Sequence, residues 1–212
     1  MYPMIKPLVV LATVSVIGSG AGTPATSTSS AGAVSPSSVA LQTAMRKLWA
    51  DHVLWTRQYI VSTVLNDPSA QAASVRLLKN QADIGNAVVP YYGAAAGAKL
   101  TDLLKQHILI AVDLVSAAKT GNAAKQADAD KRWHQNAADI ATFLSGANPN
   151  WRRQTLLDML NRHLALTTQE AVNRLQQKWN DDVSNFDAIF SQSMMMADAL
   201  SAGIIKQFPA KF

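Results

Sequence analysis

The stretch LLKQHILIAVDLV, residues 103–115, decides the fold. Its apolar residues recur at spacings of three and four, which is the period of one helix face and not the two-residue alternation of a strand. The same spacing continues from residue 41 onward, so we predict an all-α domain. The polar residue on the apolar face of this stretch is His107. Its role is therefore the first question about function.

Short segments of turn-forming residues interrupt the helical pattern five times, which predicts six helices. The breaks are Asn66-Asp67-Pro68, Tyr92-Gly93 with Gly97, Thr120-Gly121-Asn122, GANPN at residues 146–150, and Asn180-Asp181-Asp182. Pro90 lies inside the second helical segment and lacks the N–H that a helix needs, so we expect that helix to end or kink before Tyr91. Helices of this number, joined by short connections, favour an up-and-down bundle.

Three segments align without gaps on one histidine each, which indicates an internal repeat. They are LWADHVLWTRQYIVS (48–62), LLKQHILIAVDLVSA (103–117) and MLNRHLALTTQEAVN (159–173), and their histidines lie 55 and 56 residues apart. The helices that follow also correspond, through NQADIGNA from Asn80, NAADIATF from Asn136 and a looser MMMADALS from Met194. The sequence thus predicts three helical hairpins, over about residues 41–97, 98–149 and 150–212. Each has a His on its first helix and an Asp on its second.

The three repeated histidines are the candidate functional residues. Their neighbours at helical spacing are mainly apolar, so we expect all three rings on the core face. A buried imidazole that lacks a partner for one nitrogen costs about 1–3 kcal/mol. One interpretation is an internal structural tie, in which the Asp of the same hairpin, or Asn80 or Asn136, holds the ring. The other is a divalent transition-metal site on facing helices. Its predicted ligands are His52, His107, His163, Asp83, Asp139 and Asp198.

The other sequence motifs do not identify a functional site. Glu170 is the only Glu in the chain, so a di-iron carboxylate site is excluded. Residues 194–196, three consecutive Met, point about 100° apart on a helix and cannot all ligate one copper ion. His134 has no counterpart in the other repeats, and we expect it at the surface. With no Ser-His-Asp arrangement and no glycine-rich phosphate loop, we predict no catalytic residues, and an enzyme is the weakest function class.

The N-terminus predicts export. Residues 1–21, MYPMIKPLVVLATVSVIGSGA, combine one Lys, an apolar run and small residues at a cleavage site, as in a signal peptide. Residues 22–40 are rich in Ser, Thr, Ala and Pro and are expected to form a flexible tether before the domain at 41–212. No later segment is long and uncharged enough to be expected to span a bilayer. We expect the protein in the periplasm or the extracellular medium.

The distribution of charge and the absence of cysteine bear on nucleic-acid binding and on disulfide bonds, respectively. The formal net charge is +5, but the basic residues are scattered along the chain, whereas a nucleic-acid binder concentrates them on one face. We therefore expect no nucleic-acid partner. The chain has no Cys, so an exported domain of this kind must rely on packing and not on disulfides.

Several segments resemble a family of exported bacterial helical proteins without an established biochemical function. They are LWADHVLWTR, NQADIGNAVVPYYG, HILIAVDLVSAAK, FLSGANPNW, HLALTTQEAV and MMMADALSAGIIKQFPAKF, and the resemblance covers most of residues 45–212. It implies export and an all-helical fold, and it carries over no catalytic residues. More distantly, ADHVLWTRQYI and NRHLALTTQEAV are similar to the His-bearing helices of haemerythrin-type proteins. The His-x-x-x-Glu pairs of those proteins are missing here.

Two function hypotheses follow. The first is an exported helical-bundle binding protein that holds a divalent metal or a small polar ligand through His/Asp pairs on facing helices. The alternative is a non-catalytic structural or protein-interaction module, in which the same pairs are internal structural ties.

Overall fold

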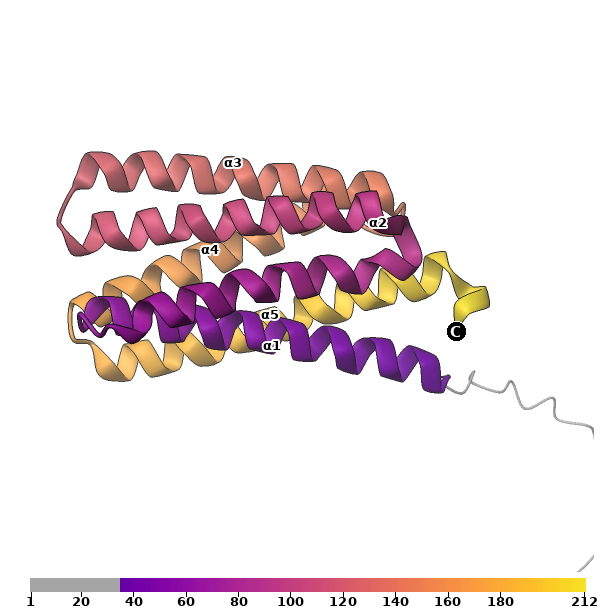
Figure 1. Ribbon diagram of the computed structural model, residues 1–212, viewed down its shortest axis with the longest axis horizontal. Helices are drawn as coiled ribbons and strands as arrows, with labels where there is room; N and C mark the ends of the chain where they lie inside the picture. Colours follow the sequence, from indigo (N-terminus) through magenta and orange to yellow (C-terminus); the bar gives the residue numbers. More distant parts are fainter. Residues whose placement is uncertain (1–34) are drawn as a thin grey trace, which may run out of the picture. The chain divides into compact units, whose positions relative to one another are not determined.

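The computed structural model describes residues 35–212, and the expected signal peptide and most of the expected tether lie outside this range. Every regular element in the described range is a helix, which confirms the all-α prediction (Figure 1). The elements are α1 (Pro36–Val64), α2 (Ser69–Lys119), α3 (Ala123–Ala147), α4 (Arg153–Leu175), α5 (Trp179–Gln207) and a short 3₁₀ helix, η1 (Pro209–Lys211). α1 begins within the stretch expected to be tether, because Ser35 caps the backbone N–H of Ser38 and Pro36 occupies the first turn.

The described residues form five helices, not six. The break expected near Tyr92 is a kink inside α2, where Gly93 has φ 84° and ψ 167°. Figure 1 shows α2 turning back within its length. The helix continues through Pro90, so the end or kink expected before Tyr91 lies instead at Gly93. Glycine decides the position, since only a residue without Cβ adopts this backbone conformation freely.

The two arms of α2 touch closely beside the kink. A Cβ on Gly97 would lie 2.7 Å from the carbonyl oxygen of Gly85, and a Cβ on Gly85 would lie 1.9 Å from Oγ1 of Thr101. Both distances are too short for real Cβ contacts. These two glycines therefore let the second arm fold back against the first.

Replacing Gly93 with Ala is expected to destabilise the protein by about 1–3 kcal/mol, because Ala is strained at a positive φ paired with an extended ψ. Gly146→Ala is the matched control. Gly146 lies in α3, and no other group lies within 4 Å of the place that a Cβ would take, so Ala there is expected to be neutral or slightly stabilising. Urea unfolding of both variants measures the difference. Equal midpoints would show that Gly93 does not hold the kink.

Three of the helices, α1, α2 and α4, end in the same way. Asn66, Gly121 and Gln177 have positive φ angles of 58°, 66° and 58°. At each turn a backbone N–H reaches back to the helix: Asp67 to Ser62, Asn122 to Ala117 and Lys178 to Asn173. This is the Schellman pattern, which satisfies carbonyls at a helix end. The third of these turns lies just before residues 180–182, where a break was expected. Those residues lie in the first turn of α5, and the carboxylates of Asp181 and Asp182 interact favourably there with the positive end of the helix dipole.

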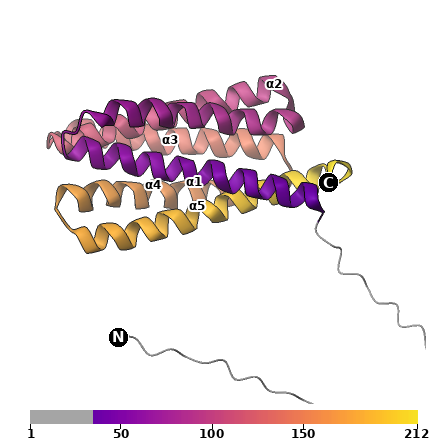
Figure 2. The same ribbon diagram turned by 60° about the horizontal axis from the view of Figure 1, so that its bottom comes forward.

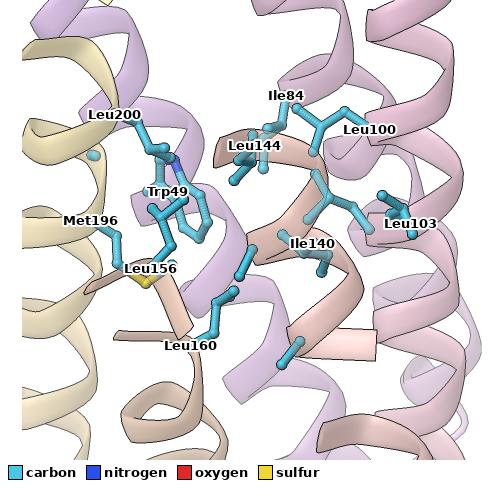
Figure 3. Packing of buried hydrophobic residues seen from close by; sticks show 14 of the residues in the cluster. Trp49, Ile84, Leu100, Leu103, Ile140, Leu144, Leu156, Leu160, Met196 and Leu200 are labelled. Carbon is cyan, nitrogen blue, oxygen red and sulfur yellow. The ribbon is translucent and has the colours of Figure 1, made fainter. Parts of the chain in front are cut away.

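All five helices contribute to one main hydrophobic core. Figure 2 shows α1 between α2 and α5, and α1 packs extensively against both. Figure 3 shows the core side chains from each helix meeting in the centre. Its labelled members are Trp49, Ile84, Leu100, Leu103, Ile140, Leu144, Leu156, Leu160, Met196 and Leu200. This core fixes the spacing of the helices that present the histidines.

α5 differs from the expectation that no segment after the signal peptide is long and apolar enough to span a bilayer. By length and composition it is apolar enough to cross a membrane, with a mean hydropathy of 1.3 in its most apolar window. Half of that window is buried against the rest of the bundle. The apolar character of α5 is therefore accounted for in large part by core packing.

Candidate functional site: a buried three-histidine cluster

The structure brings the three repeated histidines together in the interior. His52 lies on α1, His107 on the second arm of α2 and His163 on α4, and each is only 3% exposed. The ring centroid of His163 is 5.6 Å from that of His52 and 6.3 Å from that of His107. We call these three residues the three-histidine cluster. The expectation that all three rings face the core is confirmed.

Two tryptophans flank the cluster. The ring of Trp49 is 5.6 Å from that of His52 in an edge-to-face arrangement, and the ring of Trp133 is 5.2 Å from that of His107. Both indoles are buried. They separate the rings from water and place two fluorophores beside the cluster.

An amide, and not a carboxylate, holds His107. Nδ1 of His107 is 2.8 Å from Oδ1 of Asn136, and Nδ2 of Asn136 donates to the carbonyl oxygen of Leu103 at 3.0 Å. The second bond fixes which end of the amide faces the ring. Oδ1 must then accept, so this network assigns the proton of neutral His107 to Nδ1 and leaves the Nε2 lone pair free.

His163 has a similar neighbour in Gln192. Nε2 of Gln192 donates to the carbonyl oxygen of Met159 at 3.0 Å. The Gln192 side chain acts to raise the pKa of His163, yet neither Nδ1 of His163 nor Oε1 of Gln192 completes a hydrogen bond. A hydrogen bond between these two atoms would reproduce the arrangement at His107.

At His52 two amide side chains divide the two contacts that Asn136 makes at His107, one with a backbone carbonyl and one with the ring. Nδ2 of Asn80 donates to the carbonyl oxygen of Leu48 at 3.0 Å, and Nε2 of Gln81 lies 3.3 Å from Nδ1 of His52. Gln81 also donates to Oδ1 of Asn80 at 3.1 Å. Gln81 Nε2 also donates to the carbonyl oxygen of Leu77 at 2.8 Å, so its two hydrogens are shared among three acceptors and its contact with Nδ1 of His52 is the longest of the three.

One hydrogen bond of this arrangement therefore occurs three times. In each case an amide reaches the carbonyl four residues before the histidine, at Leu48, Leu103 or Met159. The amide nearest each ring lies 29 residues after its histidine: Gln81, Asn136 and Gln192. Asn80 and Asn136 were candidates from the sequence, whereas Gln81 and Gln192 were missed. The constant 29-residue spacing was the signal for them.

The three predicted aspartate ligands lie away from the cluster. Asp83 accepts from Lys79 at 2.7 Å, Asp139 is exposed and accepts from Gln135, and Asp198 pairs with Arg46 at 2.6 Å. The expected His–Asp pairing is replaced by His–amide contacts. Asp83 and Asp139 follow the core-facing Asn80 and Asn136 by three residues, a rotation of about 300° that carries them to the edge of that face. Within residues 35–212, no three His, Asp or Glu side chains already stand in an arrangement that holds a metal ion.

Burial keeps the three rings neutral. It lowers the pKa of His107 to about 3 and that of His163 to about 4. The pKa of His52 is also well below its usual value, through burial first and then through repulsion by the other two rings. At neutral pH all three are uncharged imidazoles, which is the form that donates a lone pair to a metal.

A small cavity lies one helical turn from the cluster, and no cluster histidine lines it. Its volume is about 20 Å³, and its lining includes Thr56, Trp133 and Thr167 among aliphatic side chains. Thr56 and Thr167 each follow a cluster histidine by four residues, and Oγ1 of Thr167 is buried without a hydrogen-bond partner. A space of this size holds about one water-sized species.

Two turns farther along α4 lies a buried ionic network that sequence reasoning missed. Arg57 pairs with Glu170 at 2.6 Å and with Asp182 at 2.7 Å, and Arg174 pairs with Asp182 at 2.8 Å. Both carboxylates are only 1% exposed. Burial raises the pKa of Glu170 to about 7, although Arg57 acts to lower it. The network ties α1, α4 and α5 together.

His134 is exposed, as expected for a histidine outside the repeat. Its Nδ1 lies near the carbonyl oxygen and the carboxylate of Asp130 on the same helix. It provides a natural control for experiments on the cluster.

No family model, no curated protein and no solved structure matches this chain.

Proposed function

We propose that this protein is an exported, non-catalytic helical-bundle binding protein, and that the three-histidine cluster is its ligand centre. The observation that carries the proposal is the convergence of three buried rings from α1, α2 and α4, with centroids 5.6 and 6.3 Å apart. Imidazoles of this kind serve a divalent transition metal or a small polar ligand. Export rests on the N-terminal sequence alone.

Internal repetition supports a centre shared by three hairpins. The helix-ending residues Asn66, Gly121 and Gln177 are 55 and 56 residues apart, as are the three histidines. The amide-to-carbonyl bond also recurs in each unit. With the arms of α2 counted separately, each hairpin contributes one histidine to the centre.

A second candidate function is favoured by the hydrogen bonds themselves. If the His–amide contacts are only internal ties, the domain is a structural or protein-interaction module and its function lies on the surface. The outer face of α5 then becomes relevant, because Trp179, Val183 and Phe190 are 49%, 56% and 36% exposed at spacings of four and seven.

Mass spectrometry under native and denaturing conditions separates the two candidates. For protein purified from its exported fraction without chelator, the binding proposal expects a native mass that exceeds the denatured mass by one small ligand. His107→Ala is expected to lose this difference and His134→Ala to keep it. Identical native and denatured masses for a fully folded wild type would favour the tie.

A further inference from the structure

We propose that the three-histidine cluster binds one first-row divalent metal ion through Nε2 of His107 and His163, with His52 completing the site. This inference rests on the proposed function and names its ligand. It assigns the metal to imidazoles alone, since Asp83, Asp139 and Asp198 lie at the surface with other partners.

The amide partners supply the first argument. A ligating histidine usually donates its other ring N–H to a fixed acceptor, which sets the tautomer and orients the lone pair. Asn136 does this for His107, and its own bond to the Leu103 carbonyl holds it in place. Gln192 is anchored on the Met159 carbonyl in the same manner and keeps an unpartnered Oε1 beside His163. A tie that satisfied these buried rings would use both nitrogens of each, yet no hydrogen bond from residues 35–212 reaches Nε2 of His107 or His163, so both lone pairs are available to an ion.

The ring separations supply the second argument. With metal–nitrogen distances of about 2.0–2.1 Å, rings that share one ion have centroids roughly 5 to 5.5 Å apart. The separations of 5.6 and 6.3 Å are slightly larger. The described residues hold no finished metal geometry, so binding requires the rings to move, with His107 approaching His163 by about 1 Å. The 20 Å³ cavity lies one helical turn away and no cluster histidine lines it, so it has room for a water near the site, beside the unpartnered Thr167 hydroxyl, and not for the ion itself.

The donor set indicates which metals fit. Neutral imidazole nitrogens suit Zn²⁺, Cu²⁺, Ni²⁺ and Co²⁺, whereas Mg²⁺ and Ca²⁺ require oxygen ligands. His52 is the weakest of the three ligands. Its Nδ1 faces the N–H₂ of Gln81, so coordination through Nε2 needs that amide to turn over. Loss of His52 should therefore weaken binding less than loss of His107 or His163.

Titration of chelator-treated full-length protein with Co²⁺ tests the proposal. We expect saturation at one equivalent, a visible absorption band of low-coordinate Co²⁺, and quenching of Trp49 and Trp133, whose rings lie 5.6 and 5.2 Å from cluster histidines. Zn²⁺ should displace Co²⁺, and Mg²⁺ should not. Folded wild type that shows no band and no saturable quenching would overturn the proposal.

Variants assign the ligands. His107→Gln and His163→Gln keep a polar side chain for folding, which circular dichroism checks, and each is expected to weaken Co²⁺ binding at least 100-fold. Asn136→Leu, a positioning variant, is expected to weaken it about 10- to 100-fold, with rescue by Asn136→Asp. His134→Ala should bind as wild type does. Unchanged binding in both Gln variants would contradict the site.

The two proposals fail in different ways. If the native mass reveals an organic ligand that depends on His107 while Co²⁺ and Zn²⁺ do not bind, the metal inference is wrong and the binding function stands. If no ligand is retained and no metal binds, both are wrong and the His–amide contacts are ties.

Discussion

Replacing Asp182 with Ala is expected to destabilise the protein by about 3–5 kcal/mol, because the change removes a fully buried carboxylate from two largely buried guanidinium groups. Asp182 is 1% exposed and pairs with both Arg57 and Arg174. After its removal Arg57 keeps Glu170, whereas Arg174 loses its ion-pair partner. Urea unfolding, with the slope checked for two-state behaviour, measures the loss.

Asp198→Ala is the matched control for this change. Asp198 also lies on α5 and also pairs with an α1 arginine at 2.6 Å, but its side chain is 41% exposed and that of Arg46 is 56% exposed. Solvent screens such pairs, so a much smaller loss is expected. Equal effects of the two substitutions would mean that burial does not set the importance of the Asp182 network.

Stability is expected to fall steeply as the pH drops below about 6.5. In the unfolded chain His52, His107 and His163 bind protons near pH 6.5, whereas in the folded chain burial lowers all three pKa values well below this, to about 3 for His107 and about 4 for His163. Acid therefore favours the unfolded state, by about 1.4 kcal/mol per pH unit for each histidine. The loss begins near pH 6.5 and continues down through the folded pKa values.

The protonation of Glu170 changes the stability of the protein with pH in the opposite direction. Its pKa is raised to about 7 in the folded state from a usual value of 4.5, so the folded state binds the extra proton between these values. Its contribution to stability is present below pH 4.5 and is lost as the pH rises through 7. The net slope between pH 6.5 and 4.5 is then about 3 kcal/mol per pH unit, from three histidines less one glutamate.

Urea unfolding at intervals from pH 7 to 4.5 tests this pH dependence. His107→Leu is expected to reduce the slope by about one proton, and His134→Leu to leave it unchanged. A flat profile in the wild type would show that the cluster histidines are protonated in the folded state.

A double-mutant cycle tests the partner of His107. His107→Leu combined with Asn136→Leu is expected to cost less than the sum of the two single changes, with a coupling of about 0.5–3 kcal/mol, because the pair shares a buried hydrogen bond. His107→Leu combined with Asp139→Leu is expected to be additive, since Asp139 is exposed and bonds Gln135. Coupling to Asp139 but not to Asn136 would contradict the hydrogen-bond network.

The sequence predicted the parts of this fold that depend on periodicity. Helical spacing around His107 was sufficient to place it in the core, and the alignment of the three histidines anticipated their convergence. Aspartates were predicted as the partners of the histidines, and this was wrong. Each Asp lies on the same helix as the Asn that faces the core, Asp83 with Asn80 and Asp139 with Asn136, and only three residues, less than one turn, separate the two side chains. Only the observed rotation of that helix shows which side chain faces the ring.

Other errors have local causes. Pro90 was expected to end or kink the helix before Tyr91, but α2 accommodates the proline and turns back at Gly93, which the sequence also marked as a break. The ionic network was missed because Glu170 and Asp182 belong to different helices and meet through Arg57, far away in sequence. Contacts between distant segments carry no periodic signal.

Elemental analysis of the folded protein, purified without chelator, tests most directly whether the three histidines form one centre. The account predicts about one transition-metal ion per chain in the wild type and in His134→Ala. It predicts almost none in His107→Gln or His163→Gln. A fully folded wild type without stoichiometric metal, whose stability does not change when Zn²⁺ is added, would contradict it.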